Sequence, residues 1–372
     1  MSSIVIQGDT SGSITVEAPS VAGTHTLTLP KATGNIATDA TVGLGMKNLI
    51  INGGMEIHQR GGTITMSTGN YNLDRFFSYT TTDGVQTAEQ STDAPNGFKH
   101  SLKVTTTTAD SSLAAGQRTS ILQRVEGYNI IPLAWGTADA KTVTLSFWVK
   151  SSITGTHGGS VGNGNDSRAY PFTYTILSAN TWEKKTITIP GDTTGTWATT
   201  NGRSLQIAWG LGVGSTYSGT AFAWESADRN SATGATTDVI GTLGATWFIT
   251  GVQLEIGENA TPFENRMYGT ELALCQRYYQ VISVTLSAFN TNGLVGFTFL
   301  TEMRAAPTVT RAYVGTTNRM YNVATGGTVD VTSPTIIANT QAIRYWYSFS
   351  PSGWASSTGS GWETTYSMSS EL

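Results

Sequence analysis

The chain has 372 residues, a formal net charge of −4 and only 12% charged residues, far below the roughly 25% usual in globular proteins. This composition offers no basic surface for a polyanion, so no nucleic acid is expected as a partner. No apolar run is long enough to cross a bilayer and no secretory signal opens the chain, so we expect no membrane insertion and folding in a cytoplasm. The 42 Gly, 14 Tyr and 10 Trp favour strands and turns, and an all-β fold is predicted.

Residues 1–46 predict an N-terminal β-hairpin arm. Ile14 and Val16 alternate with polar neighbours, as do Leu27 and Leu29, and a turn with Pro and Gly separates the two stretches. A lone two-stranded ribbon is marginal in water, so the arm should be ordered by sister chains or by a docking protein. The alternative is an unstructured tail.

Residues 47–268 carry regularly spaced strand patterns. The clearest is TVTLSFWVK (142–150), whose apolar residues fall on one face; YPFTYTIL (170–177), KKTITIP (184–190) and SLQIAWGL (204–211) repeat the pattern. Gly- and Asn-rich stretches such as 155–166 predict long loops between the strands. We therefore expect an antiparallel β-sandwich, closed by a strand near 249–256 that turns Val252, Leu254 and Ile256 inward.

Residues 269–372 predict a second β-domain that begins with a short helix. The stretch 270–280 has helical spacing, with Thr270 as the expected N-cap and Glu271 at the positive end of the helix dipole. Cys275, the only cysteine, should be a small apolar contact and cannot form an intrachain disulfide. Strand-like segments separated by Asn, Gly and Pro follow the helix.

Several phrases resemble known proteins. GSITV (12–16) and TLTLP (26–30), ITGVQLEIGENATPFENR (249–266), CQRYYQ (275–280) and MRAAPTV (303–309) resemble, in this order, bacteriophage tail-fibre and related virion-fibre proteins of the marine podovirus or cyanophage type. Asn52-Gly-Gly-Met-Glu56, LSFWVK (145–150) and Gly-Val-Gln-Leu-Glu (251–255) resemble the carbohydrate-binding jelly rolls attached to glycanases.

The resemblance implies a structural virion appendage protein: a homotrimeric tail fibre on the virion surface, made in the host cytoplasm. Its arm would dock on a protein of the tail, neck or head, and its outer domains would bind a host-surface glycan. Ile14, Val16, Leu27 and Leu29 are the predicted docking residues. A head or neck fibre, and a free carbohydrate-binding module protein, are the alternatives.

No enzymatic activity and no cofactor are expected. The four histidines are scattered without metal-ligand spacing, and no nucleophile or phosphate-loop motif is present. Related jelly rolls hold a structural calcium that would map onto Glu56. The usual acidic partner in the closing strand is replaced here by Gly251-Val252-Gln253, which argues against that calcium.

Candidate glycan-binding residues are aromatic side chains on polar strand faces or in loops, because sugar rings stack their C–H faces on such rings. Each of them could instead belong to the core or to a subunit interface. The candidates are Trp148, Tyr170, Trp197, Tyr217, Trp224, Trp354 and Trp362.

Overall fold

The computed structural model describes residues 3–7, 13–17, 46–287, 292–312, 319–322, 328–349 and 361–372, with side chains over 46–282, 298–310, 338–342 and 367–372. Two compact units divide the chain, Met1–Val42 and Gly43–Leu372. The prediction of three domains, with boundaries at 46 and 268, stays a prediction.

The first unit contains a β-hairpin, formed by β1 (Ser3–Gln7) and β2 (Ser13–Glu17) in antiparallel register. Ile14 and Val16 lie on β2, opposite Ile6 and Ile4. The strand that carries Ile14 and Val16 therefore pairs with β1, which precedes it in the sequence. The predicted partner stretch around Leu27 and Leu29 lies outside the described residues.

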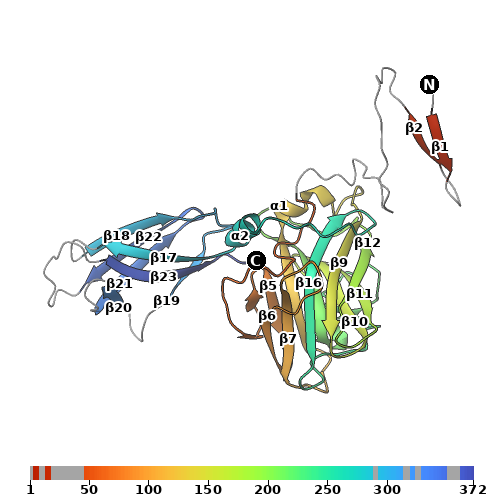
Figure 1. Cartoon of the computed structure of the whole chain (residues 1–372), viewed down its shortest axis with the longest axis horizontal. Helices are drawn as coiled ribbons and strands as arrows, with labels where there is room; N and C mark the ends of the chain where they lie inside the picture. Colours follow the sequence, from red (N-terminus) through yellow and green to blue (C-terminus); the bar gives the residue numbers. More distant parts are fainter. Residues whose placement is uncertain are drawn as a thin grey trace. The chain divides into compact units, whose positions relative to one another are not determined.

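The second unit contains an antiparallel jelly-roll sandwich of two six-stranded sheets (Figure 1). The first, called the β8 sheet, has the order β11 (Ala169–Ile176), β10 (Gly155–Asn163), β13 (Arg203–Val213), β8 (Arg118–Glu126), β5 (Phe76–Thr80) and β4 (Tyr71–Leu73). The second, called the β9 sheet, has the order β12 (Glu183–Ile189), β9 (Val143–Ser151), β16 (Thr246–Ile256), β7 (Ser101–Thr108), β6 (Val85–Ser91) and β3 (Ile64–Thr65). The predicted all-β class is confirmed.

The inner faces of the two sheets share one core. Phe147 of the β9 sheet packs edge-on against Trp209 and Tyr174 of the β8 sheet, at ring-centroid distances of 5.8 and 5.3 Å. The Trp247 indole N–H donates to the Tyr174 hydroxyl at 3.2 Å, so the polar atoms of both rings are satisfied inside the core. Burial raises the pKa of Tyr174 far above its usual value, which keeps this hydroxyl protonated.

The prediction that 155–166 is a loop is wrong, because residues 155–163 form β10 between β11 and β13. Its glycines are needed for close packing. A Cβ on Gly159 would lie 2.5 Å from the backbone oxygen of Ala208 and 2.5 Å from the Phe172 ring. A Cβ on Gly158 would lie 2.0 Å from the Ser231 hydroxyl. In this strand, glycine marks close approach of neighbouring segments.

The closing strand β16 has a bulge that interrupts its alternation, with a register shift between Thr250 and Gln253. Val252 and Leu254 are in the core, as predicted. Ile256 is not: it is 38% exposed, because it ends the strand and the chain leaves the sheet at Gly257, whose φ is +122°. The prediction of an inward Ile256 is wrong.

The predicted short helix is present as α2 (Tyr268–Gln276), but it starts and ends earlier than expected. Met267 is the N-cap, and its carbonyl accepts from the N–H groups of Thr270 and Glu271 at 2.9 and 3.1 Å, so Thr270 lies in the first turn. Cys275 is fully buried, as the helical spacing predicts. In the described part of the chain no helix is long and apolar enough for a membrane span.

A third, seven-stranded antiparallel sheet follows α2, in the region where strand-like segments were predicted. Its order is β17 (Tyr279–Ser287), β23 (Gly361–Ser369), β20 (Arg319–Asn322), β21 (Thr328–Ala338), β22 (Ala342–Phe349) and β18 (Asn292–Thr298), with β19 (Thr308–Ala312) also paired to β23. The remaining short elements are α1 (Gly127–Ile130), the 3-10 helices η1 (Ile131–Leu133) and η2 (Ser215–Tyr217), and the parallel pair β14 (Ser218–Gly219) and β15 (Ser231–Ala232).

Candidate functional site

Two partly exposed tryptophans lie on the outer face of the β9 sheet. Trp148 is on β9, between the core residues Phe147 and Val149, so its indole points away from the core. Trp182 immediately precedes β12, and Lys184 of that strand is directly opposite Trp148. Trp182, two residues before Lys184, is therefore at the position diagonal to Trp148 across this strand pair. We call Trp148 and Trp182 the indole platform.

Charged groups hold Trp182 in place. The Lys150 ammonium lies 5.2 Å from the centroid of the Trp182 ring and 4.3 Å from that of Phe248. Asp93 accepts from this ammonium and, at 3.1 Å, from the Trp182 indole N–H. The hydrogen bond from Lys150 lowers the pKa of Asp93, so the half-exposed carboxylate is ionised at neutral pH. Beside the indoles, the platform thus offers a carboxylate and an exposed Lys184 ammonium for hydrogen bonds to a ligand.

The platform continues into a longer aromatic surface through Gly251. This residue has φ +61°, and a Cβ added to it would lie 2.6 Å from Phe98 Cζ and 3.0 Å from Trp148 Cδ1. The Phe98 and Trp148 rings therefore both lie against Gly251, in space that a side chain would occupy. Phe98 then packs edge-on against Phe263 at a centroid distance of 5.0 Å. We call Trp182, Trp148, Phe98 and Phe263 the aromatic track.

Two of the predicted glycan-binding residues are core residues. Tyr170 and Trp197 are only 4% and 7% exposed. Trp197 packs edge-on against Trp135 at 4.6 Å and against Trp224 at 5.9 Å, and Tyr170 lies 5.3 Å from Trp224. Stacking on a sugar needs a free ring face, which Tyr170 and Trp197 lack, so the structure corrects both assignments.

Trp224 and Tyr217 are partly exposed, but other side chains hold them. The Trp224 indole N–H donates to the Pro190 carbonyl at 2.9 Å, and its ring closes the cluster just described. The Tyr217 ring lies 3.7 Å from the Arg118 guanidinium carbon, and that guanidinium also contacts Tyr79 at 4.3 Å. Neither residue contributes to the aromatic track.

The remaining predicted residues cannot be placed in a site. Trp354 lies outside the described residues. Trp362 belongs to β23, but its side chain lies outside the described ones. The same is true of the docking residues Ile14 and Val16, which belong to β2.

The sequence pattern alone missed Trp182, Phe98 and Phe263. Trp182 stands in the turn before β12, and the two phenylalanines lie in loops that are far apart in the sequence. Gly251 in the closing strand was the one sequence signal for this aromatic surface, because a glycine inside a strand often marks a bulge or the close approach of another segment.

A calcium ion does not fit the residues around Glu56. One Glu56 carboxylate oxygen lies 3.3 Å from the His100 ring nitrogen Nδ1. The Gln253 amide donates to Glu255 at 2.7 Å and its oxygen accepts from the Glu264 backbone N–H at 2.8 Å, so it is already engaged. Over the described residues, no group of three or more His, Cys, Asp or Glu side chains is placed to hold a metal.

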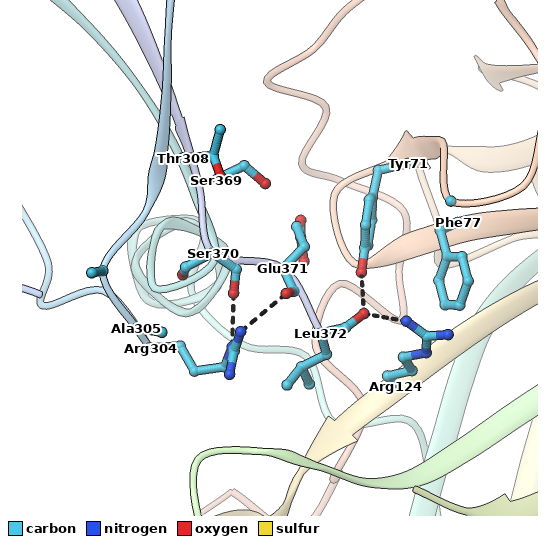
Figure 2. Close-up of a pocket in the computed structure, with 12 residues that line it drawn as sticks. Tyr71, Phe77, Arg124, Arg304, Ala305, Thr308, Ser369, Ser370, Glu371 and Leu372 are labelled. Carbon is cyan, nitrogen blue, oxygen red and sulfur yellow. Dashed lines mark hydrogen bonds between the residues drawn. The ribbon is translucent and has the colours of Figure 1, made fainter. Parts of the chain in front are cut away.

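A groove of about 450 Å³ opens where the last residues of the chain meet the β8 sheet (Figure 2). Figure 2 shows Tyr71 and Arg124 directed at Leu372, whose carbonyl accepts from both, at 3.1 Å from the Tyr71 hydroxyl. Arg304 donates to the carbonyls of Ser370 and Glu371 at 2.7 and 3.0 Å. Because these donors already bind backbone oxygens, the groove is a structural joint and a weaker ligand site than the aromatic track.

Comparisons with known proteins add little to this geometry. No protein-family model and no curated protein matches the chain. Among solved structures it is similar to the enzymatically active domain of bacteriophage CBA120 tailspike protein 4, with 15% identity over 57% of this chain and a TM-score of 0.31. The chain spans 22% of that tailspike.

Two carbohydrate-binding modules are similar at the same level. A CBM4 structure has 15% identity over 55% of this chain and 98% of its own, with a TM-score of 0.30. TmCBM61, solved with β-1,4-galactotriose, has 12% identity over 57% of this chain and 100% of its own, with a TM-score of 0.29. Similarities at this level do not establish a family or a function, so the fold is assigned from the strand order and pairing of the two sheets.

Proposed function

We propose that this chain is the subunit of a trimeric phage tail fibre that attaches the virion to a glycan on the host surface. The indole platform is the observation that carries the binding half of the proposal. The phrases shared with virion-fibre proteins, together with the N-terminal hairpin, support the virion half.

The platform suits a sugar because it combines apolar ring faces with hydrogen-bonding groups at their edges. The C–H faces of a pyranose stack on indoles, and its hydroxyls need acceptors and donors such as Asp93 and Lys184. Each contact of this kind is weak. In a trimer, three identical platforms would raise the effective concentration of later contacts, so that weak sites hold a particle.

The proposal is binding without catalysis. A glycosidase needs a general acid whose pKa is raised, opposite a second carboxylate. Two carboxyls on this side of the β9 sheet are shifted in the other direction: hydrogen bonds from Lys150 and Lys103 lower the pKa of Asp93 and of Glu89, respectively. Such paired, ionised carboxylates suit the orientation of hydroxyls.

Binding of the purified full-length protein to immobilised bacterial surface polysaccharides tests the binding half. We expect Trp148→Ala and Trp182→Ala each to weaken binding about tenfold, which corresponds to about 1.4 kcal/mol for one lost stacking contact. Tyr128→Ala is the control, since Tyr128 is 54% exposed in α1, away from the platform. If the double tryptophan variant binds as the wild type does, the platform is not the glycan site.

Two measurements test the virion half. Light scattering should give about 118 kDa, three times the 39.4 kDa chain, for a closed threefold assembly. A mass of one chain would argue against the trimer. Deletion of residues 1–46 should abolish incorporation into phage particles, and normal incorporation without the arm would refute its docking role.

A further inference from the structure

A pocket of about 210 Å³ lies at the end of the aromatic track. The turn around Gly53 and Gly54, the loop that carries Phe98 and the segment 263–266 enclose it, together with the start of α2. Phe98 and Phe263, the last two rings of the track, form its apolar wall. The pocket therefore lies at one end of the aromatic track, and the indole platform, to which the proposed function assigns the glycan, lies at the other end.

Three glutamates line this pocket, and two of them are engaged. Glu264 accepts from Arg266 at 3.1 Å and from the backbone N–H groups of Lys47 and Asn48 at 3.1 and 3.0 Å. Glu271 accepts from Arg266 at 3.4 Å and also from the backbone N–H of Asn52, in the turn that precedes Gly53. Both carboxylates therefore connect residues 264–271 to the backbone of residues 47–52.

Glu56 differs from the other two. Its side chain is 34% exposed, and His100 is its one side-chain partner among the residues that the structure describes. A carboxylate has about four lone-pair sites, so Glu56 keeps acceptor capacity toward the pocket. A carboxylate next to two aromatic rings is the combination that recognises a sugar ring, with hydroxyls on the acid and C–H groups on the rings.

We propose that this pocket binds one neutral sugar residue, the terminal pyranose of the glycan that lies on the aromatic track. The inference rests on the proposed function and names its end-group specificity. Glu56 accepts two neighbouring hydroxyls, and Phe98 and Phe263 contact the ring. Three glutamates and one arginine, Arg266, line the pocket, so its net charge is negative. It therefore repels carboxylate and phosphate groups and rejects uronic acids.

Ligand-observed NMR with the full-length protein tests this specificity. The probes are glucose, galactose, mannose and N-acetylglucosamine as neutral sugars, and glucuronate as the acidic one. We expect at least one neutral sugar to bind and glucuronate not to bind. Glu56→Gln should weaken the neutral sugar about tenfold, because a charge-assisted hydrogen bond is lost while the side-chain shape is kept. Glu258→Gln, at an exposed glutamate of the neighbouring loop, should have no effect.

The outcomes separate this inference from the function on which it rests. If polysaccharide binding depends on Trp148 while Glu56→Gln changes neither the affinity nor the preferred end group, the pocket assignment is overturned and the proposed function stands. If the wild type binds no polysaccharide, both fall. Calcium that perturbs the pocket in a Glu56-dependent manner, with no response to any sugar, would make this a cation site and would also overturn the inference.

Discussion

Gly251→Ala is the substitution that tests the aromatic track most directly. A residue other than glycine in the left-handed region costs about 1–2 kcal/mol, and the φ of Gly251 is +61°. The new Cβ would also lie 2.6 Å from Phe98 Cζ and 3.0 Å from Trp148 Cδ1. Ordinary carbon contacts are about 3.5–4.0 Å, so the Phe98 ring has to retreat by about 1 Å.

The displaced Phe98 ring loses its edge-on contact with Phe263, and such a contact is worth about 0.5–1.5 kcal/mol. The substitution should therefore destabilise the sandwich by about 2–3 kcal/mol in total. Gly244→Ala is a matched control: Gly244 has φ +76°, but no atom lies within 4 Å of its added Cβ. It should cost only the about 1–2 kcal/mol of the backbone conformation.

Urea unfolding followed by tryptophan fluorescence measures both variants against the wild type. We expect Gly251→Ala to lower the unfolding free energy by about 1 kcal/mol more than Gly244→Ala, and to be the one variant of the two that weakens polysaccharide binding. Equal destabilisation would show that Phe98 and Trp148 do not close over Gly251. Unchanged binding by Gly251→Ala would show that a glycan does not depend on the track.

Three further predictions concern the strand that was expected to be a loop, the platform and the single thiol. Gly159→Ala should destabilise the sandwich by about 1–3 kcal/mol through overpacking, whereas Gly116→Ala, with open space around its Cβ, should be close to neutral in the same urea titration. Lys150 lowers the pKa of Asp93 in the folded protein, so this pair stabilises the fold fully above the unfolded pKa of roughly 3.9, and the stabilisation is lost as the pH falls through the folded pKa. Asp93→Asn should therefore flatten the dependence of the unfolding free energy on pH in the acidic range. An unchanged pH dependence in this variant would refute the prediction. Cys275 is fully buried and burial raises its thiol pKa, so a thiol reagent should modify it only after unfolding, and rapid native-state labelling would contradict the structure.

Strands with a strict period of two could be predicted from the sequence. Val143, Leu145, Phe147 and Val149 alternate without interruption, and all four lie in the core. The strand β10 could not be predicted, because glycine is normally a signal for turns. Gly158 and Gly159 are explained by segments more than ten residues away, such as the Phe172 ring over Gly159, and the local sequence does not show that contact.

The candidate site was harder to predict than the fold. Trp148 falls on the polar face of an alternating strand pattern and Trp197 stands among threonines, yet Trp148 is partly exposed while Trp197 is in the core. The difference lies in tertiary packing: Trp197 meets the rings of Trp135 and Trp224, which come from separate segments. Trp182 could not be linked to Trp148 until the pairing of β12 with β9 set Lys184 opposite Trp148.

The placement of the platform on a sheet has a consequence for affinity. Trp148 lies on β9, an interior strand paired on both sides, and Trp182 is fixed by its hydrogen bond to Asp93. Side chains that are already ordered lose little conformational entropy when a ligand binds, so more of the weak stacking energy appears as affinity. In the proposed trimer, three identical platforms would each have this fixed geometry. A glycan surface could then contact several platforms without a conformational change in any subunit.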